Sequence, residues 1–345
     1  MVSIKDIARE LNMAVSTVSM ALNNNEKIAP KTRELVQEKA REMKYVKNGA
    51  ALDLKKQKSN LILLVLHDAS RSFFSLVIRQ VQDRASELGY DFIISTTFGG
   101  HTDTAEKFIK ERRAAAVIVY TKTINDELLN ECASQTFPIF VLGHNAGNVN
   151  PYVRSFEYQD EIPALDTCEY LISKGHKRIG FVKAFHESYG TIRSLAGFRR
   201  SMNEHHLQID ESLIFDANGN RTENGYTVTK EQILPRIDDL DAVIYANDDI
   251  AIGGMQCFND CNVKIPEQLS VIGKHNIPAS AATNPPLTTA TSFSDYRDYY
   301  SDLTTLLAGY IEGRPDTQLE ERLSVRSSTS LIIERASVKD MNKAR

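Results

Sequence analysis

The spacing of hydrophobic residues divides the chain into two parts. In the first 45 residues, apolar side chains recur every three or four positions, which is the period of an amphipathic helix. After residue 59, short apolar runs such as 61–66 alternate with amphipathic stretches such as 73–88. The pattern predicts an all-α head followed by a larger α/β body.

Three short helices are predicted in the head. Ser3 and Asp6 have the spacing of a capping box, with Asp in place of Glu, so the first helix begins there. The apolar faces are Ile4, Ile7, Ala8 and Leu11 in the first helix, Val18, Ala21 and Leu22 in the second (15–22), and Leu35, Val36, Ala40 and Met43 in the third (31–43). Two helices across a tight turn, supported by a third, form a helix-turn-helix that places its second helix in a DNA major groove. A generic three-helix bundle fits the same periodicity.

The body contains two successive sets of alternating strands and helices. Repeated units of this kind predict parallel sheets covered on both faces, and therefore two doubly wound lobes. The predicted strands are 61–66, 91–95, 115–120 and 138–142 in the first set, and 178–182, 213–215, 242–246 and 269–273 in the second. The predicted helices are 73–88, 102–113 and 124–134, then 160–173, 193–204, 223–236 and 248–261. Ligands of such folds bind at the carboxyl ends of the strands, here between the lobes.

Composition and charge narrow the class of protein. Hydrophobic residues make up 42% of the 345 residues and charged residues 25%, as in a soluble globular protein. The net charge of −4 hides an asymmetry, because residues 1–58 carry +5 and the remainder −9. A basic head on an acidic body suggests a nucleic-acid-binding module. We expect a cytoplasmic protein with reduced cysteines, because the charged N-terminus is unlike a signal peptide and the four cysteines lack C-x-x-C spacing.

Specific motifs extend through both parts. The head contains I-K-D-I-A at 4–8, T-V-S-M-A-L-N at 17–23, K-T-R at 31–33 and Y-V-K-N at 45–48. The body contains K-G-H-K-R-I-G-F at 174–181, L-A-G-F at 195–198, A-N-D-D-I-A-I-G at 246–253, L-S-V-I-G at 269–273 and R-S-S-T at 326–329. With these motifs the chain resembles the LacI/GalR family of bacterial transcriptional repressors. The resemblance implies a body of periplasmic-binding-protein type.

The resemblance assigns DNA-binding roles within the head. Val15, Ser16 and Met20 occupy the positions with which family members read bases. The family usually has a polar residue where this chain has Met20. Val15 and Met20 cannot form bidentate hydrogen bonds to guanine but can pack against thymine methyl groups, so we expect an unusual operator half-site. The residues placed to contact phosphates are Ser3, Thr17, Ser19, Asn23 and Thr32. For Ser3, helix capping is an equally good interpretation.

Residues 48–58 correspond to the family's hinge, which becomes a helix on DNA. Leu54 matches the leucine that opens the minor groove, and Ala51 matches the small residue beside it. Lys47 replaces the usual proline, and Asp53 places a negative charge near phosphates. A plain flexible linker is the alternative interpretation.

The resemblance also implies domain boundaries and an effector pocket. The head would span 1–47, the N-lobe about 59–158 and 289–317, the C-lobe about 159–288 and 318–335, and the tail 336–345. Asn247 stands where the family has a ligand amide, and Phe73 and Phe74 stand where relatives contact effector with aromatic rings. Asp248 is expected to cap the following helix.

Departures from the family pattern suggest the chemistry of the effector. Ser194, preceded by Arg193, replaces the family's usual arginine, and Asn220 replaces an aromatic residue. Lys274 and His275 stand where the family often has an aspartate that holds a sugar hydroxyl. The exchange favours an anionic effector, such as a sugar phosphate or sugar acid. In the alternative, Lys274 points to solvent and His275 packs in a loop.

These features predict a DNA-binding regulator that is controlled by a small molecule. We expect a homodimer on a palindromic double-stranded operator, and a sugar or sugar derivative as effector, with no cofactor and no metal. A sugar-binding module that has lost DNA specificity is the alternative. An enzyme is disfavoured, because the chain has no G-x-G-x-x-G, Walker or H-E-x-x-H pattern.

Overall fold

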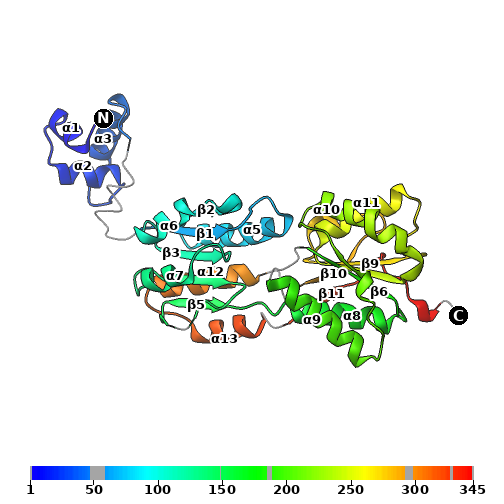
Figure 1. The fold of residues 1–345 in the computed structure, drawn as a ribbon. Coiled ribbons are helices and arrows are strands. Elements are labelled where there is room, and N and C mark those ends of the chain that lie inside the picture. Colours follow the sequence, from blue (N-terminus) through cyan, green and yellow to red (C-terminus); the bar gives the residue numbers. More distant parts are fainter. Residues whose placement is uncertain are drawn as a thin grey trace. The chain divides into compact units, whose positions relative to one another are not determined.

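The computed structural model describes residues 2–46, 59–147, 149–184, 189–291, 298–326 and 329–343. The chain divides into two compact units, Met1–Ser59 and Asn60–Arg345 (Figure 1). We call them the head and the body. No helix in these ranges is long and apolar enough to cross a membrane.

The head consists of three helices around a small apolar core. They are α1 (Ile4–Glu10), α2 (Val15–Leu22) and α3 (Pro30–Glu42). Ile7, Val18 and Val36 contribute one fully buried side chain from each helix. Asn12 turns the chain between α1 and α2 with a φ of 48°, a left-handed conformation that asparagine tolerates. The prediction that Leu35 faces this core is wrong, since its side chain is 47% exposed.

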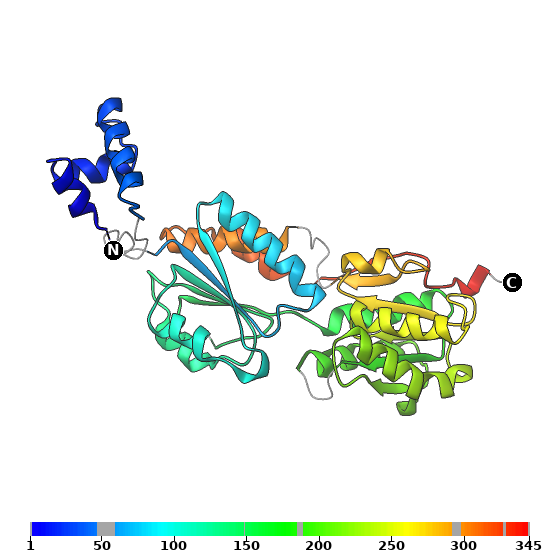
Figure 2. The same cartoon turned by 90° about the horizontal axis from the view of Figure 1, so that it is seen from above.

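The first lobe of the body, the N-lobe, contains a five-stranded parallel sheet. The strands are β1 (Leu61–Leu66), β2 (Asp91–Thr96), β3 (Ala116–Tyr120), β4 (Ile139–Leu142) and β5 (Val153–Phe156), in the order β2-β1-β3-β4-β5. The helices are α5 (Ser72–Glu87), α6 (Asp103–Lys110), α7 (Asp126–Cys132), α12 (Tyr299–Ile311) and α13 (Thr317–Arg326). Figure 2 shows α12, in orange, alongside α5, in cyan, and the two helices share one apolar cluster. β1 is apolar throughout because both faces of the sheet are covered.

The C-lobe contains a six-stranded sheet. Its strands are β6 (Ile179–Lys183), β7 (Ile214–Asp216), β8 (Ala242–Tyr245), β9 (Ser270–Lys274), β10 (Thr288–Thr291) and β11 (Leu331–Ile333), in the order β11-β10-β9-β8-β6-β7. Only β11 is antiparallel within the described pairings. The helices are α8 (Glu161–Ser173), α9 (Tyr189–Glu204), α10 (Thr222–Val228) and α11 (Asp248–Asp260). Two doubly wound lobes, as predicted, are therefore confirmed.

The single helix predicted over 223–236 is interrupted in the structure. α10 ends at Val228 and continues as a π-helical turn, Thr229–Ile233, and a 3₁₀ segment, Leu234–Asp239. Pro235 lies in the last segment and has no N–H for an α-helical bond, which explains the change of helix type. Further 3₁₀ turns are Phe98–Gly100, Glu211–Leu213, Pro278–Ala281 and Met341–Lys343.

The predicted lobe boundaries need correction at the second and third crossings. β10, at 288–291, pairs with β9 in the C-lobe sheet, so the boundary before 289 is too early. Leu319 and Leu323 of α13 pack in the N-lobe core, so the boundary at 318 is also too early. The predicted tail, described as far as residue 343, packs on the C-lobe, because the Ser337 hydroxyl is fully buried and bridges β9 and β10.

Candidate DNA-binding face and effector pocket

The first turn of α2 presents an exposed, uncharged surface. Val15 is 42% exposed and Ser16 is also exposed, whereas Thr17, Ser19 and Met20 are partly buried. Asn23 follows the helix and is exposed, and Thr32 in the first turn of α3 is partly exposed. Each of these predicted DNA-contacting residues therefore has accessible surface, whereas the core side chains Val18 and Ala21 are buried.

Ser3 is engaged in a cap at the start of α1. Its backbone N–H and its hydroxyl both donate to the Asp6 carboxylate, at 2.9 and 2.6 Å. These hydrogen bonds lower the pKa of Asp6. The sequence motif therefore gives the expected cap, with the serine hydroxyl as the donor.

The predicted hinge residues Ala51 and Leu54, with Lys47 and Asp53, lie outside the described residues.

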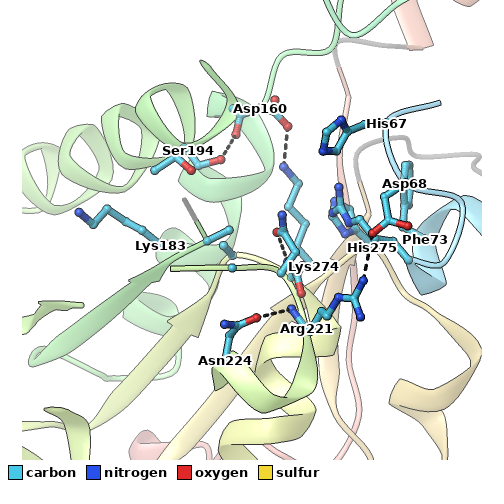
Figure 3. A pocket seen from close by; sticks show the side chains of 18 of the residues that line it. His67, Asp68, Phe73, Asp160, Lys183, Ser194, Arg221, Asn224, Lys274 and His275 are labelled. Atoms are coloured by element: carbon cyan, nitrogen blue, oxygen red, sulfur yellow. Dashed lines mark hydrogen bonds and ion pairs between the residues drawn. The ribbon is translucent and has the colours of Figure 1, made fainter. Parts of the chain in front are cut away.

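A pocket of about 640 Å³ lies in the body where strands of both lobes end (Figure 3). Both sheets are parallel there, so their carboxyl-terminal loops meet at it. The lining residues are His67, Asp68, Arg71, Phe73, Phe74, Phe98, Tyr120, Gly143, Tyr158 and Asp160, then Phe181, Lys183, Ala184, Gly190, Thr191, Ser194, Asn218, Gly219, Asn220, Arg221, Asn224, Ala246, Asn247, Lys274 and His275. Seven of the eight predicted effector residues are among them.

Arg193 is the exception among the predicted effector residues. It does not line the pocket, and its guanidinium lies 3.6 Å from the Glu161 carboxylate. Ser194, the next residue, does line the pocket and donates a long hydrogen bond of 3.3 Å to the Asp160 carbonyl. Successive helical residues differ in direction by about 100°, so Arg193 points away from the pocket that its neighbour Ser194 lines.

Aromatic rings form one wall of the pocket. The Phe73 ring is 4.6 Å from the His275 ring and 6.1 Å from the Tyr120 ring, measured between centroids. Phe74 is only 4% exposed and belongs mainly to the N-lobe core. Phe73 is therefore the predicted phenylalanine with more surface available to a ligand.

Lys274 points into the pocket, not to solvent, and its charge is compensated. Its Nζ donates to Asp160 Oδ1 at 2.7 Å, and the residue is 9% exposed. His275 adopts a φ of 100° beside it, and burial holds the pKa of its imidazole well below the usual value. A neutral histidine and a paired lysine add little net positive charge. The anionic-effector hypothesis therefore loses the two residues on which it was based.

Asn247 lines the pocket, but its amide is engaged in structure. Its Oδ1 accepts from the Ile250 N–H, so it is the N-cap of α11, and its Nδ2 donates to Asn220 Oδ1 at 2.8 Å. The prediction that Asp248 is the cap is wrong. That fully buried carboxylate accepts from the Ile277 N–H at 3.0 Å and the Thr289 hydroxyl at 2.6 Å, and burial raises its pKa to about 7. Asp248 thereby fixes the loop that follows Lys274.

Sequence reasoning missed three cations that line the pocket. Arg71 precedes α5, Lys183 ends β6, and Arg221 precedes α10. Lys183 lies 3.3 Å from the Asp216 carboxylate, and Arg221 lies 3.4 Å from Asp68 across the two lobes. All three follow or end strands at the ligand-binding edge, which is the signal that could have identified them.

Hydrogen bonds join the lobes beside the pocket. The Ser72 hydroxyl donates to Asp249 Oδ1 at 2.6 Å, in addition to the Arg221–Asp68 pair. In the ranges that the structure describes, no group of three or more His, Cys, Asp or Glu residues could hold a metal ion. The pocket therefore offers apolar rings, amides and ion pairs, which suit reversible binding of a polar organic molecule.

Family profiles match both parts of the chain. The profile described as bacterial regulatory proteins, lacI family, matches residues 3–48. The profile described as periplasmic binding protein-like domain matches residues 168–329.

Curated relatives are similar over most of their length. The HTH-type transcriptional repressor PurR of Vibrio atlanticus is 28% identical over 295 residues, which cover 84% of this chain and 86% of that protein. The HTH-type transcriptional repressor CytR of Escherichia coli is 28% identical over 298 residues, covering 83% and 84%.

Solved structures share the fold. The lac repressor dimer bound to operator and the anti-inducer ONPF has a TM-score of 0.76 at 20% identity, over 98% of this chain and 99% of that chain. The CelR–cellobiose complex, a transcriptional regulator, has a TM-score of 0.66 at 18% identity, over 98% and 100%.

Proposed function

The chain is a member of the lacI family of bacterial regulatory proteins, which bind DNA and regulate transcription, and on this basis we propose that it represses a carbohydrate-utilisation operon. The observation that carries the proposal is the combination, in one chain, of an exposed α2 face and a pocket of about 640 Å³ lined by both lobes. A sugar or sugar derivative is the proposed effector, by analogy with the CelR–cellobiose complex.

The pocket supplies a route for control by the effector. Three contacts join the N-lobe to the C-lobe here: the Ser72–Asp249 hydrogen bond, the Arg221–Asp68 ion pair and the contact between the Phe73 and His275 rings. A ligand that adds or breaks contacts between the lobes favours one lobe arrangement over another. If only one arrangement suits operator binding, the coupling is reciprocal, so operator DNA changes effector affinity by the same factor.

We further propose that the protein acts as a homodimer on a palindromic operator. One helix-turn-helix makes few base contacts, and a two-fold dimer doubles them on a site with matching symmetry. The lac repressor, whose fold this chain shares, was crystallised as a dimer on its operator.

The first test is selection of DNA by the purified full-length protein. Fragments enriched from genomic and random DNA should contain an inverted repeat, and footprinting should show protection of both halves. Ser16→Ala should weaken binding to the enriched site by about tenfold, because a base or phosphate contact contributes about 1–3 kcal/mol. Ser86→Ala is the matched control, since Ser86 is exposed on α5 in the body.

The second arm adds pools of sugars and sugar derivatives to the bound complex. The complete proposal is supported by a compound that changes the affinity of the protein for its operator. The compound's own affinity for the protein should differ by the same factor between the operator-free and the operator-bound protein. Absence of any enriched sequence, with and without these pools, would indicate a sugar-binding module without DNA specificity.

A further inference from the structure

Arg71 differs electrostatically from the other cations that line the pocket. Lys274 is paired with Asp160, Lys183 with Asp216, and Arg221 with Asp68. Among the residues that the structure describes, no carboxylate forms an ion pair with Arg71, and its Nε is buried without a hydrogen-bond partner. Its guanidinium lies over the Phe74 ring, 5.4 Å from the centroid.

The two carboxylates whose charges act on Arg71, Asp68 and Asp249, are already engaged. Asp68 accepts hydrogen bonds from the backbone and hydroxyl of Ser70, at 2.9 and 2.6 Å, and from Arg221. Asp249 accepts from the Ser72 hydroxyl. Their charges act on Arg71 from a distance, and burial nevertheless lowers the pKa of the guanidinium. A desolvated cation without a hydrogen-bonded anion is costly to a folded protein.

We propose that the effector carries an acidic group, a carboxylate or a phosphate, which Arg71 binds while Phe73 packs against the ring of the ligand. The proposal rests on the proposed function, because it concerns the same pocket. A guanidinium presents a planar set of donors that fits either anion in a bidentate geometry. The guanidinium lies over the Phe74 ring, and Phe73 is the neighbouring ring that lines the pocket.

Sulfate is the simplest probe of the anion subsite. Thermal unfolding of the full-length protein would be measured in sulfate and in chloride at equal ionic strength, for the wild type, Arg71→Gln and Arg79→Gln. Arg79 is exposed on the same helix and outside the pocket, so Arg79→Gln controls for the general stabilisation by sulfate and for loss of one charge. Arg71→Lys tests whether a positive charge without the planar guanidinium is enough to bind sulfate.

We expect a saturable rise in Tm with sulfate in the wild type and in Arg79→Gln, with the half-saturating concentration at least about tenfold higher in Arg71→Gln. Arg71→Lys should fall between them, because it keeps the charge and loses the planar fork. Equal sulfate responses in the wild type and Arg71→Gln would overturn the proposal.

Calorimetry then distinguishes the two acidic groups and the neutral alternative. Glucose, glucuronate and glucose 6-phosphate share one ring, so they compare a neutral hydroxymethyl group, a carboxylate and a phosphate. We expect one of the acidic compounds to bind the wild type at least about tenfold more tightly than glucose, and to lose that advantage in Arg71→Gln. Tighter binding of glucose would overturn the proposal, and if none of the three binds, the sulfate comparison decides.

The same ligands separate this inference from the proposed function. A neutral sugar that releases wild-type protein from its operator would leave the proposed function intact and contradict the acidic effector. An acidic compound that binds through Arg71 without changing operator affinity would support the subsite and contradict control of DNA binding through the pocket.

Discussion

Replacing Gly253 by alanine should separate α11 from α10 and disturb one side of the effector pocket. A Cβ on Gly253 would lie 1.9 Å from the Thr222 carbonyl oxygen, and a Cβ on Gly225 would lie 1.9 Å from the Ile250 carbonyl oxygen. Both neighbours are backbone atoms, which cannot move aside by changing rotamer. Ordinary contact begins at 3.4 Å, so the helices must part by about 1.5 Å.

The magnitude follows from two opposing effects. Alanine in a helix interior is favoured over glycine by about 1 kcal/mol, and overpacking of this kind costs about 3 kcal/mol or more. We therefore expect Gly253→Ala to lower the free energy of unfolding by about 2 kcal/mol. The 2.8 Å hydrogen bond between Asn247 and Asn220 joins the starts of the two helices, and the displacement would lengthen it beyond 3.5 Å.

Tyrosine fluorescence during urea unfolding is a suitable assay for the body. The chain has no tryptophan and 13 tyrosines, of which only Tyr45 lies in the head. Gly309→Ala on α12 is the matched control, because its Cβ would approach backbone no closer than 3.0 Å and its helix propensity improves. If Gly253→Ala proves as stable as the wild type or as Gly309→Ala, the backbone-contact argument is wrong.

Three further predictions concern separate parts of the molecule. A double-mutant cycle of Lys274→Met and Asp160→Asn should give a coupling energy of about 1–3 kcal/mol by urea unfolding, and additive effects would show that the 2.7 Å pair is unimportant for stability. Because burial raises the pKa of Asp248 from 3.8 to about 7, the folded state binds its proton more tightly than the unfolded state, and stability should fall by up to about 4 kcal/mol as pH rises from about 4 to above 7. Asp248→Asn should remove this dependence. A difference in the free energy of unfolding between wild type and variant that does not change with pH would contradict the prediction. Met20→Ala should weaken binding to the selected operator by about fivefold or more and lower discrimination at thymine positions, as measured by competition with substituted sites. Equal competition by all four bases would exclude a base-reading role.

Local sequence signals determined the head and the order of elements in the body. The Ser3–Asp6 box, the apolar period of three and four, and Asn12 at the turn each act within a few residues. The same holds for the strand at 61–66, whose continuous apolar run requires a sheet covered on both faces. Such signals are visible in one sequence because their physical causes are short-ranged.

The lobe crossings were less predictable, since pairing partners there are distant in the chain. Thr288–Thr291 has no strong apolar pattern, yet it pairs with β9, and α13 joins the N-lobe through Leu319 and Leu323. Ser337, which looks like the start of a polar tail, is buried between two strands. No local period reports such contacts.

The sequence by itself determined which loops line the pocket, because parallel strands place their carboxyl ends at one edge. Only the tertiary structure decided which charges in those loops remain available. Lys274 was the predicted cationic ligand, but Asp160, 114 residues away, neutralises it. The position of Arg71 after a strand placed it at the pocket edge, but its lack of an ion-pair partner became visible only in the folded chain, where it lies over an aromatic ring and near carboxylates bound elsewhere. The charge state of a buried site depends on long-range partners and on desolvation, and neither is encoded in the local pattern of residues.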